Sequence, residues 1–178
     1  DMHSNFRPTR PDTDSPAVGG LIALSAYIDA ERAARGDDKV LLLDAGNLVS
    51  GTPLDEYEVN GVRGGAMLSW LKSASYDAWT LGSHEFDFGL SVTKSMVVSS
   101  PAPVLSSNLD APGGGPGIKG IMDSRIFALA GSNVGVIGVT HHRLTRQSGA
   151  TVKGMMIRDP VDAVKEQIGR LSGQVDMI

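Results

Sequence analysis

Short apolar runs alternate along this chain with stretches of helical periodicity, and this alternation restricts the chain to a layered α/β fold. Residues 40–43 read Val-Leu-Leu-Leu, without the polar alternation of a half-exposed strand, so we expect a strand buried on both faces. A helical pattern precedes this run over residues 20–35 and ends at Gly36. Two more helix and strand pairs follow, at residues 65–73 with 78–81 and at residues 90–98 with 103–106.

The order of elements changes in the last third of the chain. Residues 125–129 and 134–139 predict two adjacent strands joined as a hairpin. Asp159 and Pro160 then predict the start of a helix. The buried face of that helix is predicted from its apolar stripe, which consists of Val161, Val164, Ile168 and Leu171. Residues 175–178 read as the opening of another strand. The sequence thus predicts a layered α/β sandwich in which helices flank a mixed sheet.

The composition suits one acidic globular domain over residues 1–178, with residues 7–16 and 111–117 as loops within it. The chain has 16 basic and 20 acidic side chains, a net charge of -4 and no dense run of Lys or Arg, so a nucleic-acid polymer is not expected as a partner. No apolar stretch reaches the roughly 20 residues that a membrane span needs. Cysteine is absent, so a metal ion would have to be bound by His, Asp, Glu or Asn.

Residues suited to metal or phosphate chemistry follow three of the expected strands. In chain order these residues are Asp44 and Asn47, then Ser83, His84, Glu85 and Asp87, then Asn108, and a further pair, Asp1 and His3, opens the sequence. Loops at the carboxyl ends of parallel strands meet at one edge of a sheet. We therefore expect the clusters to form one site although they lie far apart in the sequence.

Several of these residues also have simpler interpretations. Asp1 and His3 could form a frayed pair in solvent, and Asp44 is expected to cap a turn at the end of its strand. Asn47 and Asn108 suit turns as well as a site.

The neighbouring residues favour structural roles. Glu85 is expected to bind the backbone of its loop, and Phe86 and Phe88 are expected to pack in the core or against the loop. His141 and His142 favour a solvated loop rather than the metal-ligand set.

Four motifs carry a family resemblance. They are Asp-Met-His at residues 1–3, Leu-Asp-Ala-Gly-Asn at 43–47, Gly-Ser-His-Glu-Phe-Asp at 82–87 and Gly-Val-Ile-Gly-Val-Thr at 135–140. In these motifs the chain resembles the calcineurin-like metallophosphoesterase superfamily, in its branch of 5'-nucleotidases and 2',3'-cyclic nucleotide phosphodiesterases. The resemblance implies the metallophosphoesterase type of α/β sandwich, present here as a partial N-terminal catalytic domain whose first strand and later metal-ligand segments are absent from residues 1–178.

The resemblance also implies a two-metal hydrolase of nucleotide phosphoesters. Asp1 and His3 would hold one divalent ion, which could be Mn, Zn, Mg or Ca. Asn47 occupies the position of the family's bridging Asp, and Ser83 occupies the position of a metal-binding Asn. Two divalent ions clamp a phosphoryl group and acidify the attacking water.

His84 and Asp87 match the family's catalytic dyad, in which the carboxylate orients an imidazole that acts on the phosphoryl oxygens or the leaving group. The two altered positions weaken the metal site, because Asn47 lacks the charge that offsets repulsion between two cations and Ser83 has a short, neutral side chain. We therefore also expect that the site could bind fewer than two divalent ions.

Two functional alternatives follow from these substitutions. The intact protein could be a hydrolase of nucleotides or other phosphoesters, completed by a C-terminal nucleotide-binding domain and, by resemblance, periplasmic, secreted or on the cell surface. It could instead be a catalytically silent binding module, and the substitutions at Asn47 and Ser83 could also have been introduced deliberately. Residues 1–178 by themselves are expected to be inactive.

Overall fold

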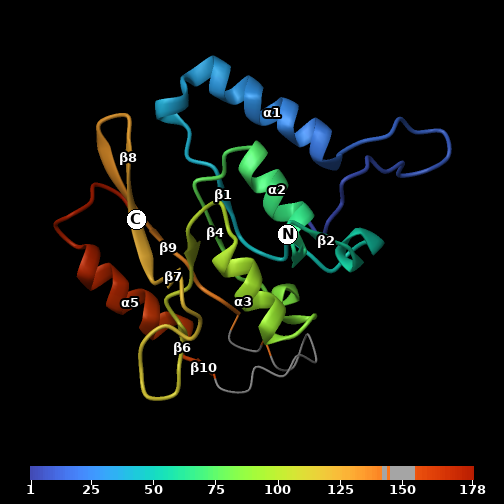
Figure 1. The fold of residues 1–178 in the computed structure, drawn as a ribbon. Coiled ribbons are helices and arrows are strands. Elements are labelled where there is room, and N and C mark those ends of the chain that lie inside the picture. The colour runs from blue at the N-terminus through green and yellow to red at the C-terminus, as the bar shows by residue number, and fades with distance from the viewer. Residues whose placement is uncertain (142–143, 145–154) are drawn as a thin grey trace.

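The computed structural model describes residues 1–141, 144 and 155–178, and it confirms the mixed α/β architecture (Figure 1). The described helices are α1 (Gly20–Arg35), α2 (Gly65–Ser73), α3 (Leu90–Val98) and α5 (Pro160–Leu171), with 3-10 turns η1 (Asp37–Lys39), η2 (Pro53–Glu56) and η3 (His84–Phe86). The described strands are β1 (Leu43–Asp44), β2 (Glu58–Val59), β3 (Val62–Arg63), β4 (Ala78–Thr80), β5 (Val104–Leu105), β6 (Leu109–Asp110), β7 (Ile121–Met122), β8 (Ser124–Leu129), β9 (Ser132–Ile137) and β10 (Met156–Ile157). The predicted bounds of α1, α2 and α3 are confirmed.

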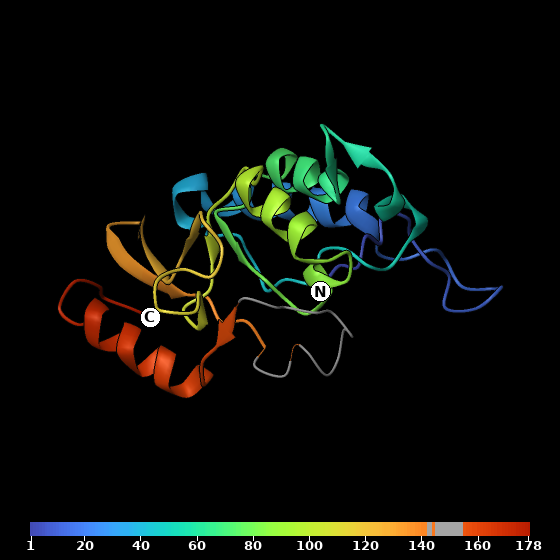
Figure 2. The ribbon, with the colours of Figure 1, turned by 60° about the horizontal axis from the view of Figure 1, so that its bottom comes forward.

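The central sheet contains four parallel strands in the order β1, β4, β5 and β7. Helix α2 connects β1 to β4, and α3 connects β4 to β5, as the alternation of apolar and helical segments predicts. Figure 2 shows α1, α2 and α3 on one side of the sheet, with the β8–β9 hairpin and α5 on the other. Because the strands are parallel, the segments that follow β1 and β4 leave the sheet at the same edge.

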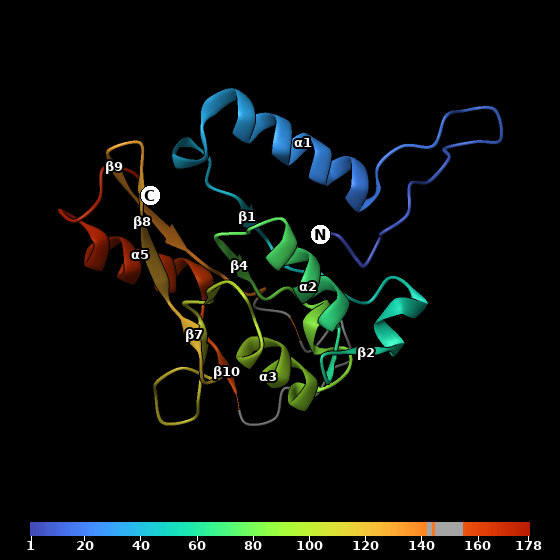
Figure 3. The ribbon, with the colours of Figure 1, turned by 45° about the horizontal axis from the view of Figure 1, so that its top comes forward.

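The prediction of a strand over residues 40–43 buried on both faces is wrong. Strand β1 covers only Leu43 and Asp44, and Leu43 is 42% exposed. The physical reason is that β1 lies at the end of the sheet and, among the described strands, pairs with β4 alone. Figure 3 shows α1 running past this edge strand. An apolar run indicates that a segment is hydrophobic, but it does not indicate whether the strand pairs with one or two neighbouring strands.

The predicted hairpin is confirmed, because β8 and β9 pair in antiparallel register from Ser124 opposite Ile137 to Leu129 opposite Ser132. Its turn falls at residues 130–131, where both residues have positive φ, and β9 begins two residues before the expected start at residue 134. Residues 175–178 do begin to pair beside this hairpin, since Met177 forms a parallel bridge.

The predicted start of α5 is also confirmed. Asp159 Oδ1 accepts hydrogen bonds from the backbone N–H groups of Val161 at 2.8 Å and Asp162 at 3.2 Å. These bonds satisfy two donors that the first turn of a helix leaves unpaired.

The predicted buried face of α5 is partly wrong. Of the apolar stripe only Leu171 is buried, and Val161 and Ile168 are 57% and 44% exposed. The buried residues of α5 are Ala163, Gln167 and Leu171. Gln167 is turned inward because its amide accepts from Ser124 Oγ at 2.9 Å and donates to Asp123. A helix that packs mainly on one hairpin buries a narrower face than its apolar stripe suggests.

The apolar core anchors the loops that leave the sheet edge. Trp79 of β4 is buried between its neighbours, Leu48 is fully buried in the segment after β1, and Phe86 is buried in the turn η3. Burying a side chain of this size contributes about 1.5–3 kcal/mol. Each polar loop at this edge therefore contains an apolar residue that fixes its position.

Several short elements were not predicted, namely the β2–β3 hairpin, the pairing of β6 with β10, and β7. Strands of two residues are too short to show periodicity. Residues 7–16 and 111–117 contain no helix and no strand longer than a bridge, as expected. Within the described residues, no helix is long and apolar enough to cross a membrane.

Candidate functional site

The segments after β1 and β4 meet at the carboxyl edge of the sheet through two glycines. Gly46 has φ +91, and a Cβ there would collide with the backbone of Gly82 and lie 2.8 Å from Thr80 O. A Cβ on Gly82 would collide with the side chain of Asn47 and lie 2.6 Å from its backbone N. Only residues without a Cβ allow the two loops to approach this closely.

Asn47 lies at the centre of this meeting point, with φ +53. Its Nδ2 donates to Asp1 Oδ1 at 2.7 Å. Its Oδ1 accepts from the backbone N–H of His84 at 3.0 Å and from Ser83 Oγ at 3.4 Å. If the Asn47 amide were flipped, its oxygen would face the Asp1 carboxylate and its NH2 group would face the His84 N–H. Both contacts would be repulsive, so the surrounding groups determine the orientation of the amide.

Glu85 holds the two loops together from beneath, which confirms its expected structural role. Its buried carboxylate accepts from the backbone N–H groups of Asn47 at 2.9 Å, Leu48 at 2.6 Å and Gly82 at 2.6 Å. Burial raises the pKa of the Glu85 carboxyl, and these N–H groups act in the opposite direction.

Asp1 and His3 are part of the same site rather than a frayed pair. The backbone N–H of His3 donates to Asn47 O at 2.9 Å, and that of Ser4 donates to Leu48 O at 2.8 Å. His3 Nε2 lies 3.1 Å from Asp1 Oδ1, and His3 Nδ1 lies 3.5 Å from the carbonyl oxygen of Ser50. The first residues of the chain therefore run alongside the loop that follows β1.

His84 and Asp87 form a close pair. The turn η3 begins at His84, and residues three apart in a 3-10 turn lie one above the other. This local geometry places His84 Nδ1 2.6 Å from Asp87 Oδ2. The His84 ring also lies edge-on to that of His3, with centroids 4.6 Å apart. All six residues singled out as site candidates are thus brought together.

Two residues of this region were missed in the sequence. Ser50 Oγ donates to Asp87 Oδ2 at 2.5 Å. Asp55 is buried, and its carboxylate accepts hydrogen bonds from the backbone N–H groups of residues 50–52 and from the hydroxyl of Ser4. A sequence signal for Asp55 exists, because Thr52 and Asp55 have capping-box spacing around Pro53, and the structure forms that box.

Other candidates have structural roles. Asn108 is buried and exchanges two hydrogen bonds with the backbone of Thr140, at 2.8 and 2.9 Å. Asp44 Oδ1 accepts from Gly46 N at 2.8 Å, as expected of a turn cap, and burial raises its pKa against that hydrogen bond. Phe86 is in the core, as expected, and Phe88 packs under the guanidinium of Arg63.

A cavity of about 360 Å³ borders the site. Its lining includes Asn47, Gly82 and Ser83 of the site together with Thr140, His141 and Pro160. His141 therefore lies at the same edge as the predicted ligands, whereas His142 is outside the described residues.

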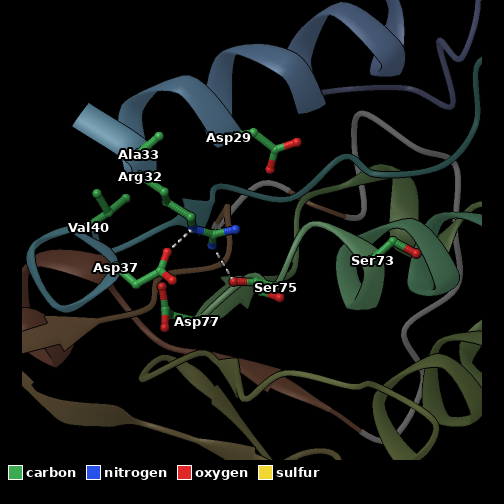
Figure 4. A pocket seen from close by; sticks show the side chains of 8 residues that line it. All are labelled: Asp29, Arg32, Ala33, Asp37, Val40, Ser73, Ser75 and Asp77. Atoms are coloured by element: carbon green, nitrogen blue, oxygen red, sulfur yellow. Dashed lines mark hydrogen bonds and ion pairs between the residues drawn. The ribbon is translucent and has the colours of Figure 1, made fainter. Parts of the chain in front are cut away.

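A larger cavity, of about 630 Å³, lies elsewhere (Figure 4). Arg32 of α1 projects into it and donates to Ala74 O and Ser75 O, both at 2.8 Å, with Asp37 3.8 Å away. These bonds fasten α1 to the end of α2. None of the predicted site residues lines this cavity.

Among the described residues, one pair of donors has a spacing that suits a single divalent ion. Two donors bound to one ion at about 2.1 Å lie roughly 3 to 3.4 Å apart, which matches the separation of Asp1 Oδ1 and His3 Nε2. Asn47 does not supply a third donor atom beside this pair, because its amide N–H, and not its amide oxygen, faces Asp1. Within the described residues, no group of three or more His, Asp or Glu is placed to hold a metal ion. The described residues thus offer one pair of adjacent donors and no complete metal site.

No protein-family model matches the chain. The chain is 33% identical over 150 residues, 84% of its length, to a probable 5'-nucleotidase of Treponema pallidum. It is 27% identical to the solved structure of a 5'-nucleotidase precursor from Thermus thermophilus, with a TM-score of 0.83 over 98% of the chain and 33% of that structure. A calcineurin-like phosphoesterase from Bacillus subtilis shares the fold, with 22% identity and a TM-score of 0.78 over 98% of the chain and 56% of that structure. The chain spans 24–30% of the length of the first curated relatives that it matches.

Proposed function

We propose a function for this chain from the premise that it belongs to the calcineurin-like metallophosphoesterase superfamily, in its 5'-nucleotidase branch. The whole protein hydrolyses a phosphoester of a nucleotide or a related phosphate, and residues 1–178 supply part of the catalytic site. The observation that carries this proposal is the convergence of three separate segments on the His84–Asp87 pair at the carboxyl edge of the sheet.

The roles of the residues follow from their contacts. Asp87 accepts from His84 Nδ1, so the other ring nitrogen, Nε2, is free to act on a substrate. In the proposed hydrolysis water attacks phosphorus and the bond to the leaving oxygen breaks. His84, protonated on both ring nitrogens, gives its Nε2 proton to that oxygen, and the proton released by the attacking water restores the imidazolium. Asp1 and His3 are the proposed ligands of one divalent ion, which would polarise a phosphoryl oxygen. We assign Asn47 and Ser83 to the altered ligand positions.

The proposed partners lie outside this chain. The remaining length of the relatives supports a further domain that binds the nucleoside, so residues 1–178 by themselves should not turn over substrate. A relative named as a precursor supports export from the cytoplasm. Hydrolysis by the isolated 178 residues above a His84→Ala control would contradict the need for that domain.

A second candidate is a catalytically silent module that keeps the fold for binding. The specific observation in its favour is the amide of Asn47, which gives the Asp1 carboxylate a hydrogen-bond donor where a metal site needs an oxygen. In this case the site is held together by hydrogen bonds rather than by ions.

Metal content and turnover of the full-length protein separate the two candidates. The protein is equilibrated with Mn²⁺ or Zn²⁺, freed of excess metal, and analysed for bound ions and for hydrolysis of nucleoside monophosphates. The hydrolase requires at least one ion per chain and activity that His84→Ala removes. The silent module predicts neither, and it predicts that the double variant Asn47→Asp with Ser83→Asn gains both metal and turnover. Turnover that survives His84→Ala would contradict the role assigned to the dyad.

A further inference from the structure

Ser50 lies between the two halves of the candidate site. Its hydroxyl donates to Asp87 Oδ2 at 2.5 Å, and its carbonyl oxygen lies 3.5 Å from His3 Nδ1. Ser50 therefore contacts a side chain of the His84–Asp87 pair and a side chain of the His3–Asp1 pair through its own atoms. We infer that Ser50 is a positioning residue, which fixes the Asp87 carboxylate and through it the His84 imidazole; this inference rests on the proposed hydrolase function.

The backbone holds Ser50 in an unfavourable conformation. Its φ is +73, in the left-handed region that costs a residue with a Cβ of order 1 kcal/mol. The conformation is held by the buried Asp55 carboxylate, which accepts from Ser50 N at 2.9 Å and Gly51 N at 3.2 Å. Glycine adopts this φ at lower cost, so Ser50→Gly removes the hydroxyl without adding backbone strain.

The Asp87 carboxylate depends on that hydroxyl for its orientation. Both described partners of the side chain, Ser50 Oγ and His84 Nδ1, bind the same oxygen, Oδ2. The other oxygen, Oδ1, is buried and has no hydrogen-bond partner among the described residues. Without the Ser50 hydroxyl the carboxylate could turn about its last bond, and His84 would lose a fixed acceptor for its Nδ1 proton.

The test compares variants at Ser50 in the full-length protein. Ser50→Gly removes the hydroxyl and keeps the positive φ, whereas Ser50→Asn keeps a side-chain donor on a residue that tolerates this φ. Ser75→Gly is the matched control, because Ser75 is another serine with positive φ, +53, and it is exposed at the far end of the sheet. Thermal unfolding verifies that each variant is folded.

Two readouts distinguish positioning from a general structural role. The first is the imidazole NMR spectrum, in which the exchange of the His84 Nδ1 proton with water is measured against a His84→Ala spectrum. The second is the separation of kcat from KM on a nucleoside monophosphate. For Ser50→Gly we expect faster exchange of that proton and a kcat lowered by about tenfold at unchanged KM, because one hydrogen bond to a charged group is lost. Ser50→Asn should recover most of both effects, and Ser75→Gly should show neither.

An unchanged His84 proton signal in Ser50→Gly, or an equal change in Ser75→Gly, would overturn the inference. If the wild-type protein hydrolyses no phosphoester, the proposed function fails, and the exchange of the His84 proton still decides whether Ser50 orients the pair.

Discussion

Buried carboxylates hold the loops of the candidate site from beneath, and Glu85 is the most completely enclosed of them. It is 0% exposed and accepts hydrogen bonds from three backbone N–H groups that belong to two separate loops. A carboxylate in this position replaces the hydrogen bonds that the loop backbone would otherwise make to water.

Replacing Glu85 by Ala should lower the free energy of unfolding by about 3–5 kcal/mol, because buried N–H donors would lose their acceptor. Urea unfolding followed by circular dichroism measures the loss. Glu56→Ala is the control, since Glu56 forms a surface pair with Arg63 that contributes at most about 1 kcal/mol. Equal losses in the two variants would contradict the anchoring role of Glu85.

The environment of Tyr76 predicts how the stability of the protein depends on pH. It packs against Trp70 with centroids 5.2 Å apart, and burial, together with the charge of Asp44, raises its pKa to about 12, while Arg32 acts in the opposite direction. A raised pKa in the folded state means that the unfolded chain loses this proton first. Tyr76 therefore contributes stability below its ordinary pKa of about 10, and this contribution is lost between pH 10 and 12.

The absorbance of tyrosinate near 295 nm should show a step near pH 12 in the folded protein, and Tyr76→Phe should remove it. A titration in which Tyr76→Phe leaves the high-pH step unchanged would refute the assignment.

Among the elements, α5 shows how far a periodic pattern can mislead. The start of the helix was predictable, because an N-cap is a local interaction between Asp159 and the next turn. The buried face of α5 was not predictable, because the position of the β8–β9 hairpin decides which side chains of the helix pack against β9. Leu171 is 5% exposed and Ile168 44% exposed although both belong to the predicted stripe.

We expect Leu171→Ala to lower the free energy of unfolding by about 2–4 kcal/mol and Ile168→Ala by less than about 1 kcal/mol, because only Leu171 leaves a cavity. Both variants remove apolar side chains from the same helix, so helix propensity is matched within a few tenths of a kcal/mol. Chemical denaturation compares them, and a larger loss for Ile168→Ala would show that the stripe is covered in the full-length protein.

At the scale of the whole molecule, the candidate site forms because the crossover through α2 brings the ends of β1 and β4 to one edge, and two glycines let the following loops touch. Gly82→Ala should lower the free energy of unfolding by about 1–3 kcal/mol and disturb Asn47, because the added Cβ collides with its side chain. Gly169→Ala in α5 is the control, since nothing lies within 4 Å of the added Cβ and alanine favours a helix.

Thermal unfolding and the backbone amide NMR signals of Asn47 and His84 measure these effects. Unperturbed signals in Gly82→Ala would contradict the close approach of the loops.

Much of the candidate site was predictable from local patterns. The segment of residues 82–87 and the polar end of an expected strand identified four of the six candidates, and the family resemblance added Asp1 and His3. The expected parallel order of the strands predicted that the loops after them converge. Ser50 was missed because its contact with Asp87 joins residues 37 positions apart, and nothing in the sequence near Ser50 records that distant partner. Asp55 was missed although its capping spacing was present.

The sequence by itself determined the alternation of strands and helices, the bounds of α1, α2 and α3, the cap of α5 and the family, because each depends on residues close together or on motifs several residues long. The tertiary structure alone decided that β1 is an exposed edge strand, which face of α5 is buried, and that Asn47 turns its amide N–H toward Asp1. These features depend on which distant groups surround a residue, and hydrophobicity, periodicity and spacing along the chain do not encode the neighbours that folding brings together.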